Sequence, residues 1–234
     1  MTRGPAGALH PIVLAITGAS GAPYAVRLLE RLLLACRGVQ LIVSSHGLRL
    51  LRTEVDIDSV AALRERVGAE AWDAYVRVFE DADRGAAPAS GSGRSAGMVI
   101  CPCSMGTLSA IAAGSSRSLV ERAADVALKE RRPLLLVPRE TPLSAIHLEN
   151  MLRVTQAGAI VLPAAPGFYH RPSRVEDLVD FIVARVLDHL GVDHGLVPRW
   201  GESEVRGPRS QMRRGGGDVP RTAHRELRTD AGDV

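Results

Sequence analysis

Small hydroxyl and glycine residues follow three separate apolar runs in the sequence. Thr17-Gly18-Ala19-Ser20-Gly21 follows the first run, Ser44-Ser45 the second, and Cys101-Pro102-Cys103-Ser104-Met105-Gly106-Thr107 the third. Each motif stands directly before a segment with helical spacing, and free backbone N–H groups at a helix start attract phosphate. One such motif alone could be a plain turn or a serine N-cap. The three together predict an anionic cofactor that carries one phosphate.

The spacing of these residues argues against a dinucleotide and against a metal site. The glycines do not form G-x-G-x-x-G, and no acidic residue follows the second apolar run to hold a ribose hydroxyl. The three cysteines, at positions 36, 101 and 103, form neither a disulfide framework nor a C-x-x-C pair. No second cluster completes a zinc site. We therefore expect a mononucleotide or a flavin and no metal.

Cationic side chains occur where a second anion could bind. Lys129 is the single lysine of the chain, and it follows Arg122 by seven residues on a predicted helix, so the two side chains share one face. Arg122 could instead pair with Asp125, three residues further on. Arg185 stands at the edge of the apolar stripe of the last predicted helix, where an ordinary surface arginine is the alternative.

Two further motifs follow apolar runs near the middle of the chain. In Pro138-Arg139-Glu140-Thr141-Pro142, the arginine and the glutamate could pair with each other, or act as a phosphate-binding guanidinium beside an acid/base carboxylate. In Gly167-Phe168-Tyr169-His170, the tyrosine could be a half-buried loop aromatic or could face a ligand. His147 fits a surface or capping position better than a catalytic one.

Strand-like and helix-like segments alternate along the body of the chain, which predicts one open parallel α/β sheet sandwiched by helices. Strands are expected at 12–16, 39–43, 76–79, from 98, 134–137 and 159–162. Helices are expected at 22–36, 45–54, 61–72, 104–113, 119–129, 141–157 and 175–190, with a loop at 86–95. Ligands of such sheets bind at the carboxyl ends of the strands, so the residues that follow each strand should form the site.

Length, composition and charge bound the class of protein. The chain has 234 residues, of which 46% are hydrophobic, and this suits one domain, which we place at 1–205. Residues 206–234 hold seven arginines and four acidic residues. Their excess of positive charge equals the net charge of the whole chain, +3. This composition predicts a disordered basic tail. The neutral body and 3% aromatic content argue against a nucleic-acid partner. No membrane span or signal peptide is apparent, so we expect a cytoplasmic protein.

Five segments together resemble the UbiX family of flavin prenyltransferases, and the resemblance extends from residue 11 to about residue 201; these segments are 17–21, 101–104, 121–133, 138–142 and 168–172. The resemblance implies a flavodoxin-like, Rossmann-like subunit in a homododecamer, with sites at subunit interfaces. It implies metal-independent transfer of a dimethylallyl group from dimethylallyl monophosphate to N5 and C6 of reduced FMN. The product, prenylated FMN, would serve a UbiD-type decarboxylase.

The resemblance also assigns roles by position. The flavin contacts would be Gly18, Ala19, Ser20, Ser44, Ser104, Met105, Gly106, Thr107 and Arg122. The donor phosphate would bind Lys129, Arg139, Tyr169 and Arg185, with Arg139 from the same or a neighbouring subunit. Glu140 would be the acid/base, and the catalytic group would also include Ser20. Some members carry Trp near residue 84, where this chain has Asp81 to Gly85 without an aromatic ring, so Trp200 is the remaining candidate to stack on an allylic cation.

Two other functions would suit a flavoprotein of this fold. A flavin-dependent decarboxylase of cysteinyl peptides is expected to carry a Pro-x-Met-Asn signature with a catalytic cysteine, and neither appears in this sequence. A non-enzymatic FMN carrier would need the flavin contacts but would not need Glu140 beside Arg139 and Lys129.

Overall fold

Six parallel strands form one sheet in the order β3-β2-β1-β4-β5-β6, as seen in a computed structural model that describes residues 10–197. This is the strand order of doubly wound Rossmann-like sheets, so the predicted open parallel α/β fold is confirmed. The strands are β1 (Ile12–Ile16), β2 (Val39–Val43), β3 (Val76–Phe79), β4 (Gly97–Cys103), β5 (Leu134–Pro138) and β6 (Ile160–Val161).

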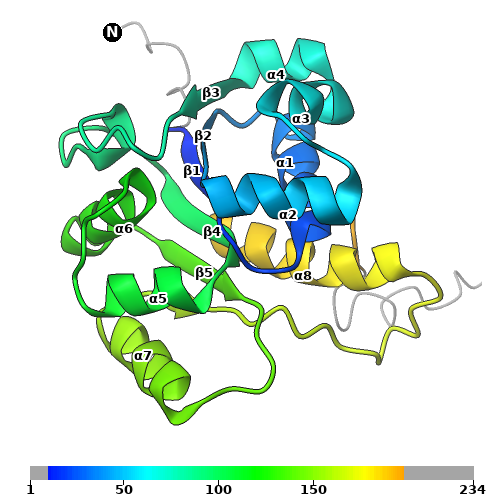
Figure 1. Cartoon of the computed structure of the whole chain (residues 1–234). Helices are drawn as coiled ribbons and strands as arrows, with labels where there is room; N and C mark the ends of the chain where they lie inside the picture. Colours follow the sequence, from blue (N-terminus) through cyan, green and yellow to red (C-terminus); the bar gives the residue numbers. More distant parts are fainter. Residues whose placement is uncertain (1–9, 198–234) are drawn as a thin grey trace, which may run out of the picture. The chain divides into compact units, whose positions relative to one another are not determined.

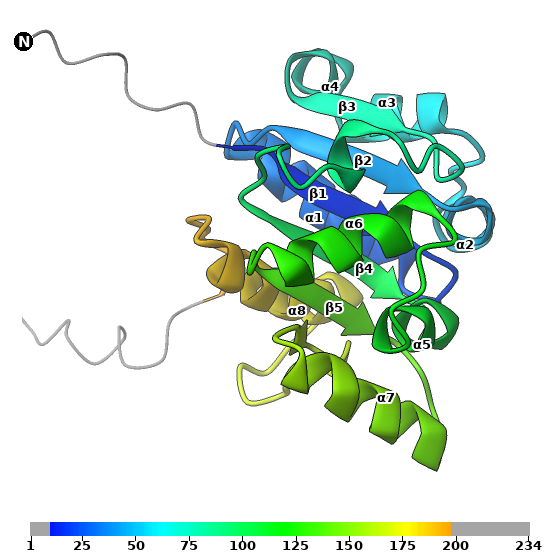
Figure 2. The same cartoon turned by 90° about the vertical axis from the view of Figure 1, so that its left-hand side faces the viewer.

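Helices cover both faces of the sheet (Figures 1 and 2). One face is covered by α1 (Ala22–Leu34), α2 (Ser45–Val55), α3 (Val60–Val67), α4 (Ala69–Tyr75) and α8 (Val175–Leu190). The other face is covered by η1 (Ala87–Ala89), α5 (Met105–Ala112), α6 (Leu119–Lys129) and α7 (Ala145–Gln156). Because both faces are buried, β1 alternates between the two cores and reads as an uninterrupted apolar run.

Strand β4 changes face at its carboxyl end. Val99 and Cys101 belong to the core under α1 and α8, and Ile100 to the core under α5 and α6. Two residues after Cys101, Cys103 faces the second core, because the pairing with β5 shifts register between Ile100 and Cys103. Burial raises the pKa of the Cys101 thiol to about 12 and raises that of Cys103 as well. Both sulfurs are therefore neutral thiols at physiological pH.

The structure corrects two predicted helices. The segment expected to form one helix at 61–72 forms two helices, with Gly68 between them. Gly68 interrupts the helix because its φ is +102°, a backbone conformation that residues other than glycine rarely adopt. The helix expected from 141 begins at Ala145. Ser144 caps it by accepting a hydrogen bond from the His147 backbone, and His147 Nδ1 accepts one from the Ser144 backbone. His147 is thus a capping histidine, one of the two positions expected for it.

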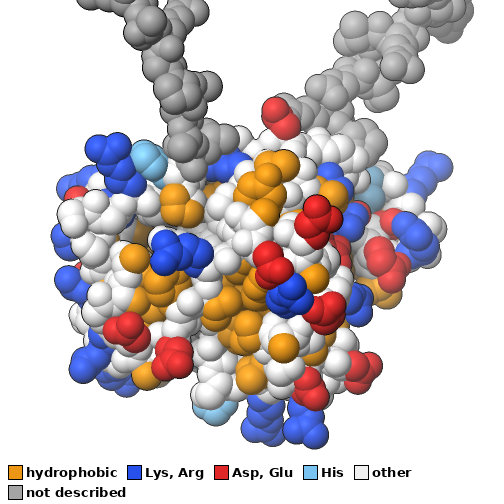
Figure 3. Space-filling model, turned by 90° about the horizontal axis from the view of Figure 1, so that it is seen from above, with side chains coloured by type: hydrophobic (Ala, Val, Ile, Leu, Met, Phe, Trp, Pro, Cys, Tyr) orange, Lys and Arg blue, Asp and Glu red, His pale blue; other side chains and the backbone are white. Residues whose placement is uncertain are grey.

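In the part of the chain that the structure describes, no helix is long and apolar enough to cross a membrane. Positive and negative side chains are intermixed on the face shown in Figure 3, with apolar side chains between them, which agrees with the neutral body of the sequence. Trp200 and the tail at 206–234 lie outside the described residues. The domain boundary, the state of the tail and the cytoplasmic location stay predictions.

Candidate active site

The carboxyl ends of β1, β2, β4 and β5 point to the same edge of the sheet, as Figure 2 shows. The three hydroxyl-bearing motifs follow β1, β2 and β4, so the fold brings them to one edge. Arg139 follows β5 at this same edge. The sequence predicted this much, because parallel strands place their carboxyl ends together.

Thr17 joins the first motif to the third. Its hydroxyl Oγ1 accepts a hydrogen bond from the Ser104 backbone N–H at 2.9 Å and donates one to the Pro102 carbonyl at 2.9 Å. The side chain is only 2% exposed, so both bonds are shielded from water. The sequence contained Thr17 within a motif but did not reveal this role, which depends on the neighbouring strand.

Gly18 allows the start of α2 to approach the first motif. A Cβ atom on Gly18 would lie 2.6 Å from Cβ of His46, closer than such atoms can come, so any side chain there would push the two segments apart. Ser44 caps α2, because its Oγ accepts a hydrogen bond from the Gly47 backbone at 3.0 Å. The first motif therefore lies against the first turn of α2, the helix that the second motif begins.

The N-terminus of α5 offers donors to an anion. Ser104 Oγ accepts a hydrogen bond from the Thr107 backbone at 3.1 Å and lies 2.9 Å from Thr107 Oγ1. Within residues 10–197, the backbone N–H groups of Met105 and Gly106 have no hydrogen-bond acceptor. Such unpaired donors, together with the positive end of the helix dipole, are what binds phosphate at helix starts.

The N-terminus of α1 is already occupied by a carboxylate of the protein itself. Glu54 Oε2 accepts hydrogen bonds from the backbone N–H groups of Gly21 at 2.9 Å and Ala22 at 2.8 Å. Pro23 has no N–H to offer. A phosphate therefore cannot use α1 without displacing Glu54, which leaves the starts of α2 and α5. Sequence reasoning missed Glu54, since it lies 33 residues beyond Gly21 and no spacing rule connects them.

Arg139 lies against the first motif. Its Nε donates a hydrogen bond to the Ser20 carbonyl at 3.1 Å, within one chain. Glu140 is exposed, and its Oε1 accepts a hydrogen bond from the Thr141 backbone at 3.1 Å. The alternative of an Arg139–Glu140 ion pair is not observed among the described ion pairs. The Glu140 carboxylate is thus not neutralised by its neighbour.

The remaining predicted cations form local ion pairs. Arg122 Nη1 lies 2.7 Å from Asp125, the alternative that the spacing had left open, and Arg185 Nη1 lies 2.7 Å from Asp188. Lys129 contacts Glu130. The three cationic side chains are 37%, 50% and 47% exposed, and exposed pairs of this kind contribute less than about 1 kcal/mol. A phosphate could therefore replace these carboxylates at little cost.

Lys129 lies away from the carboxyl edge of its own chain. It ends α6, a helix that runs back along the sheet to the amino ends of β4 and β5, where the Met98 N–H bonds to the Pro133 carbonyl at 2.8 Å. A Cβ atom on Gly91 would lie 2.9 Å from Lys129 Nζ, which places the ammonium beside the loop before β4. The seven-residue spacing from Arg122 predicted that both residues lie on one helix, as α6 confirms, but it could not show which end of the sheet Lys129 would reach.

Tyr169 and Arg185 are connected through α8. The Tyr169 ring centroid lies 5.8 Å from that of Phe181, and Phe181 precedes Arg185 by four residues, one turn of the helix. Helix α8 covers the face opposite α6, so Tyr169 and Arg185 lie across the sheet from Lys129. One chain thus places its predicted donor-phosphate residues in three groups, with Arg139 at the carboxyl edge.

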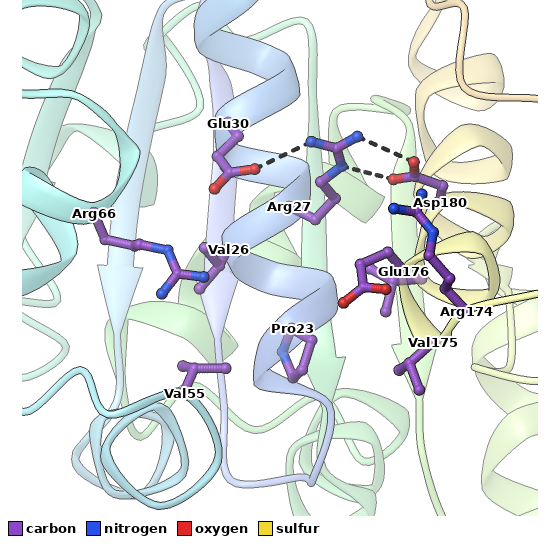
Figure 4. A pocket seen from close by; sticks show the side chains of 11 residues that line it. Pro23, Val26, Arg27, Glu30, Val55, Arg66, Arg174, Val175, Glu176 and Asp180 are labelled. Carbon is purple, nitrogen blue, oxygen red and sulfur yellow. Dashed lines mark hydrogen bonds and ion pairs between the residues drawn. The ribbon is translucent and has the colours of Figure 1, made fainter.

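A pocket of about 420 Å³ lies beside α1 and α8 (Figure 4). Arg27 reaches across it, with Nε 2.6 Å from Asp180 Oδ1 and Nη2 3.0 Å from Asp180 Oδ2, and also contacts Glu30 at 3.3 Å. None of the sequence-predicted site residues lines this pocket. Its bidentate ion pair joins α1 to α8, and we read it as structural. Across residues 10–197, no group of three or more His, Cys, Asp or Glu residues could hold a metal.

Comparison with known proteins gives the family. The Flavoprotein family matches residues 3–187. A flavin prenyltransferase UbiX from Pseudomonas aeruginosa is 54% identical over 201 residues, which cover 83% of this chain and 95% of that protein. The chain belongs to the UbiX family of flavin prenyltransferases. The resemblance seen in its motifs is thereby confirmed.

Solved UbiX structures share the fold. AnUbiX, crystallised with FMN and dimethylallyl pyrophosphate, superposes with a TM-score of 0.76 at 41% identity, over 82% of this chain and 98% of that one. A dodecameric FMN-dependent UbiX-like decarboxylase from Escherichia coli O157:H7 gives a TM-score of 0.74 at 41% identity, over 81% and 98%. The roles of individual site residues in this UbiX family member stay predictions.

Proposed function

We propose that this protein transfers a dimethylallyl group from dimethylallyl monophosphate to N5 and C6 of reduced FMN, and that a UbiD-type decarboxylase uses the prenylated FMN. The observation that carries the proposal is the meeting of three hydroxyl motifs with unpaired helix N–H groups at one sheet edge, beside Arg139. Relatives named flavin prenyltransferase support it. So does AnUbiX, which was crystallised with FMN and dimethylallyl pyrophosphate.

The flavin phosphate would bind at the starts of α5 and α2. Ser104 and Thr107 supply hydroxyl groups there, Met105 and Gly106 supply N–H donors, and Ser44 stands at the start of α2. Glu54 keeps the phosphate away from α1 by filling its two N–H positions and by repelling a second anion. FMN supplies the nucleophilic ring, which Arg139 and Ser20 would hold at the same edge.

The donor phosphate would bind between copies of the chain. Lys129 lies across the sheet from Tyr169 and Arg185, and at the end of α6 away from Arg139, so it would join them only from a second copy. The dodecameric relative from E. coli supports an assembly in which such a site forms. We propose a homododecamer for this chain as well.

The residues would act by charge and not through a metal. A phosphate monoester carries about −1.5 to −2 charges at pH 7. When the carbon–oxygen bond breaks, its electron pair leaves with the phosphate, and Lys129, Arg139 and Arg185 would stabilise that charge. One end of the dimethylallyl group would bond to N5 and the other to C6, each with loss of a ring proton to the Glu140 carboxylate, which would return one proton to the allylic double bond as the ring closes. The leaving phosphate can accept a proton in turn.

Anaerobic incubation with reduced FMN and dimethylallyl monophosphate tests this function. We expect a flavin heavier by one dimethylallyl unit. A carrier would return unmodified FMN, and a cysteinyl-peptide decarboxylase would modify its peptide and not its flavin. The structure favours cysteinyl-peptide decarboxylation less than prenyl transfer, because Cys101 and Cys103 are buried, neutral thiols and a catalytic cysteine reacts as the thiolate.

A further inference from the structure

Three aromatic rings join the segment that carries Tyr169 to helix α8. The His170 imidazole stacks on the Phe181 ring, with centroids 5.4 Å apart and planes inclined by 9°. The Tyr169 ring meets both of them edge-on, with centroids 5.7 Å from His170 and 5.8 Å from Phe181. Both arrangements are favourable for aromatic pairs. Two neighbouring rings therefore set the orientation of Tyr169.

The Gly167 backbone lies close to the rings of both Tyr169 and Phe181. A Cβ atom at this position would lie 3.0 Å from Tyr169 Cε1 and 3.2 Å from Phe181 Cζ. At these distances a neighbouring ring must shift by a few tenths of an ångström, so a side chain at position 167 would crowd the Tyr169 and Phe181 rings. The backbone and two side chains thus confine the Tyr169 ring, although the residue is 68% exposed.

His170 contributes the face of its ring and not its nitrogens. Both Nδ1 and Nε2 are buried, and neither has a hydrogen-bond partner in the described part of the chain. Stacking on Phe181 requires only a flat ring of this size.

Helix α8 supplies a firm base for this arrangement. Phe181 is partly buried against the core under α1 and α8, and Arg185 follows it by one turn on the same side of the helix. The Arg27–Asp180 pair attaches the same part of α8 to α1. The platform beneath Tyr169 and the guanidinium of Arg185 are therefore held by one rigid element.

We propose that His170 and Phe181 are positioning residues that fix Tyr169 for contact with the phosphate of an allylic phosphate donor. This inference rests on the proposed function, because it assumes that Tyr169 contacts the donor. It assigns no proton transfer to His170. It predicts that changes in the three rings of Tyr169, His170 and Phe181 weaken binding of the donor but not binding of FMN.

Kinetics of His170→Ala, His170→Phe and Gly167→Ala test the proposal. His170→Ala removes two ring contacts and should raise KM for dimethylallyl monophosphate about five- to tenfold, with kcat and the Kd for FMN within about twofold of wild type. His170→Phe keeps the flat ring and should restore the wild-type KM. Gly167→Ala should raise KM as well, because the added Cβ displaces Tyr169.

Val175→Ala, at an exposed position at the start of α8, is the matched control and should leave KM unchanged. Calorimetric binding of dimethylallyl monophosphate measures the same effect without turnover, and thermal unfolding identifies any variant that fails to fold. An unchanged donor affinity in His170→Ala and Gly167→Ala would overturn the proposal, as would a loss in His170→Phe equal to that in His170→Ala. Absence of product from the wild-type protein would refute the proposed function instead.

Discussion

Thr17 and Ser104 lie 87 residues apart in the sequence, yet the Thr17 hydroxyl accepts a hydrogen bond from the Ser104 backbone at 2.9 Å. Ser104 in turn caps α5, the helix whose unpaired N–H groups we assign to the flavin phosphate. The Thr17 hydroxyl, together with the Thr17 backbone N–H that bonds to the Pro102 carbonyl at 3.2 Å, thus holds the first motif against the third and contributes to the geometry of the flavin site.

Replacement of Thr17 by valine should weaken both the fold and the flavin site. Valine keeps the shape but leaves the Ser104 N–H without an acceptor and removes one of the two hydrogen bonds to the Pro102 carbonyl, which also accepts from the Thr17 backbone at 3.2 Å. The loss should cost about 1–3 kcal/mol in the free energy of unfolding. FMN affinity should fall about tenfold or more, because the start of α5 moves. Urea unfolding and fluorescence titration with FMN measure the two effects. Thr17→Ser keeps the hydroxyl and should retain FMN binding; equal losses in both variants would contradict this role.

Glu54 should stabilise the start of α1. Glu54→Ala leaves the Gly21 and Ala22 N–H groups without an acceptor, so the free energy of unfolding should fall by about 1–2 kcal/mol, as for loss of an N-cap. Glu54→Gln keeps an acceptor oxygen and should lose less. Chemical denaturation followed by circular dichroism gives both values. Identical stabilities of the three proteins would show that the carboxylate does not cap this helix.

Replacement of Glu140 by glutamine should separate flavin binding from catalysis. Its exposed carboxylate contacts the Thr141 backbone and no flavin-loop residue, so the variant should still purify with, or take up, stoichiometric FMN. Product formation should fall by about 10²- to 10⁴-fold, the usual contribution of a general acid/base. Absorbance of bound flavin and mass analysis of the product test this. Normal product formation would end the proposed role of Glu140.

Two inactive variants should complement each other and restore activity in a mixed assembly if each site takes residues from two copies of the chain. Lys129→Ala and Glu140→Gln should each be inactive alone, because each assembly lacks one group at every site. In assemblies formed from equal amounts of both chains, about a quarter of the sites receive both intact groups, so about a quarter of wild-type activity should return. Co-expression with two affinity tags gives the mixed assembly. Its complete inactivity would show that each site takes Lys129 and Glu140 from the same chain, whereas full activity of Lys129→Ala alone would place Lys129 outside the site.

Acid should loosen the start of α8 through Asp177. Hydrogen bonds from the Ser173 and Arg174 backbone lower the pKa of Asp177 from 3.8 to about 2. Because the folded-state pKa is the lower one, this stabilisation is present above 3.8 and is lost as the pH falls toward 2. The protection of amide protons at the start of α8, measured relative to their intrinsic exchange rates at each pH, should therefore fall over that interval in the wild type. Asp177→Asn should show little change in protection there, and an equal loss of protection in both proteins would rule out this cap.

The sequence predicted the sheet and the three hydroxyl motifs because both depend on local patterns. Continuous apolar runs such as Ile12–Ile16 indicate buried parallel strands, and the residues after such strands meet at one edge. Glu54 and Phe181 were not predicted, since their roles depend on contacts between segments far apart in the chain. The helix at 61–72 was wrong because one glycine, Gly68, in an otherwise helical pattern gives no warning that it has a positive φ.

The resemblance implied a donor site at a subunit interface, and one chain does not bring Lys129 together with Tyr169 and Arg185. Sequence spacing placed Arg122 and Lys129 on a common face, but it could not show that Lys129 ends at the amino edge of the sheet. Arg122 and Arg185 pair with acids three residues away, a local interaction that spacing does reveal. We propose that assembly completes the donor site, and the spacing of residues in one chain cannot show which groups a second copy supplies.

The most direct test of the account is the mass of the flavin released after anaerobic incubation of the wild-type protein with reduced FMN, deuterated dimethylallyl monophosphate and a metal chelator. We predict a flavin that carries the full deuterium label, with one inorganic phosphate released for each labelled flavin. Unmodified FMN under these conditions, or label that appears only when a divalent metal is restored, would contradict prenyl transfer driven by the protein's own cationic side chains.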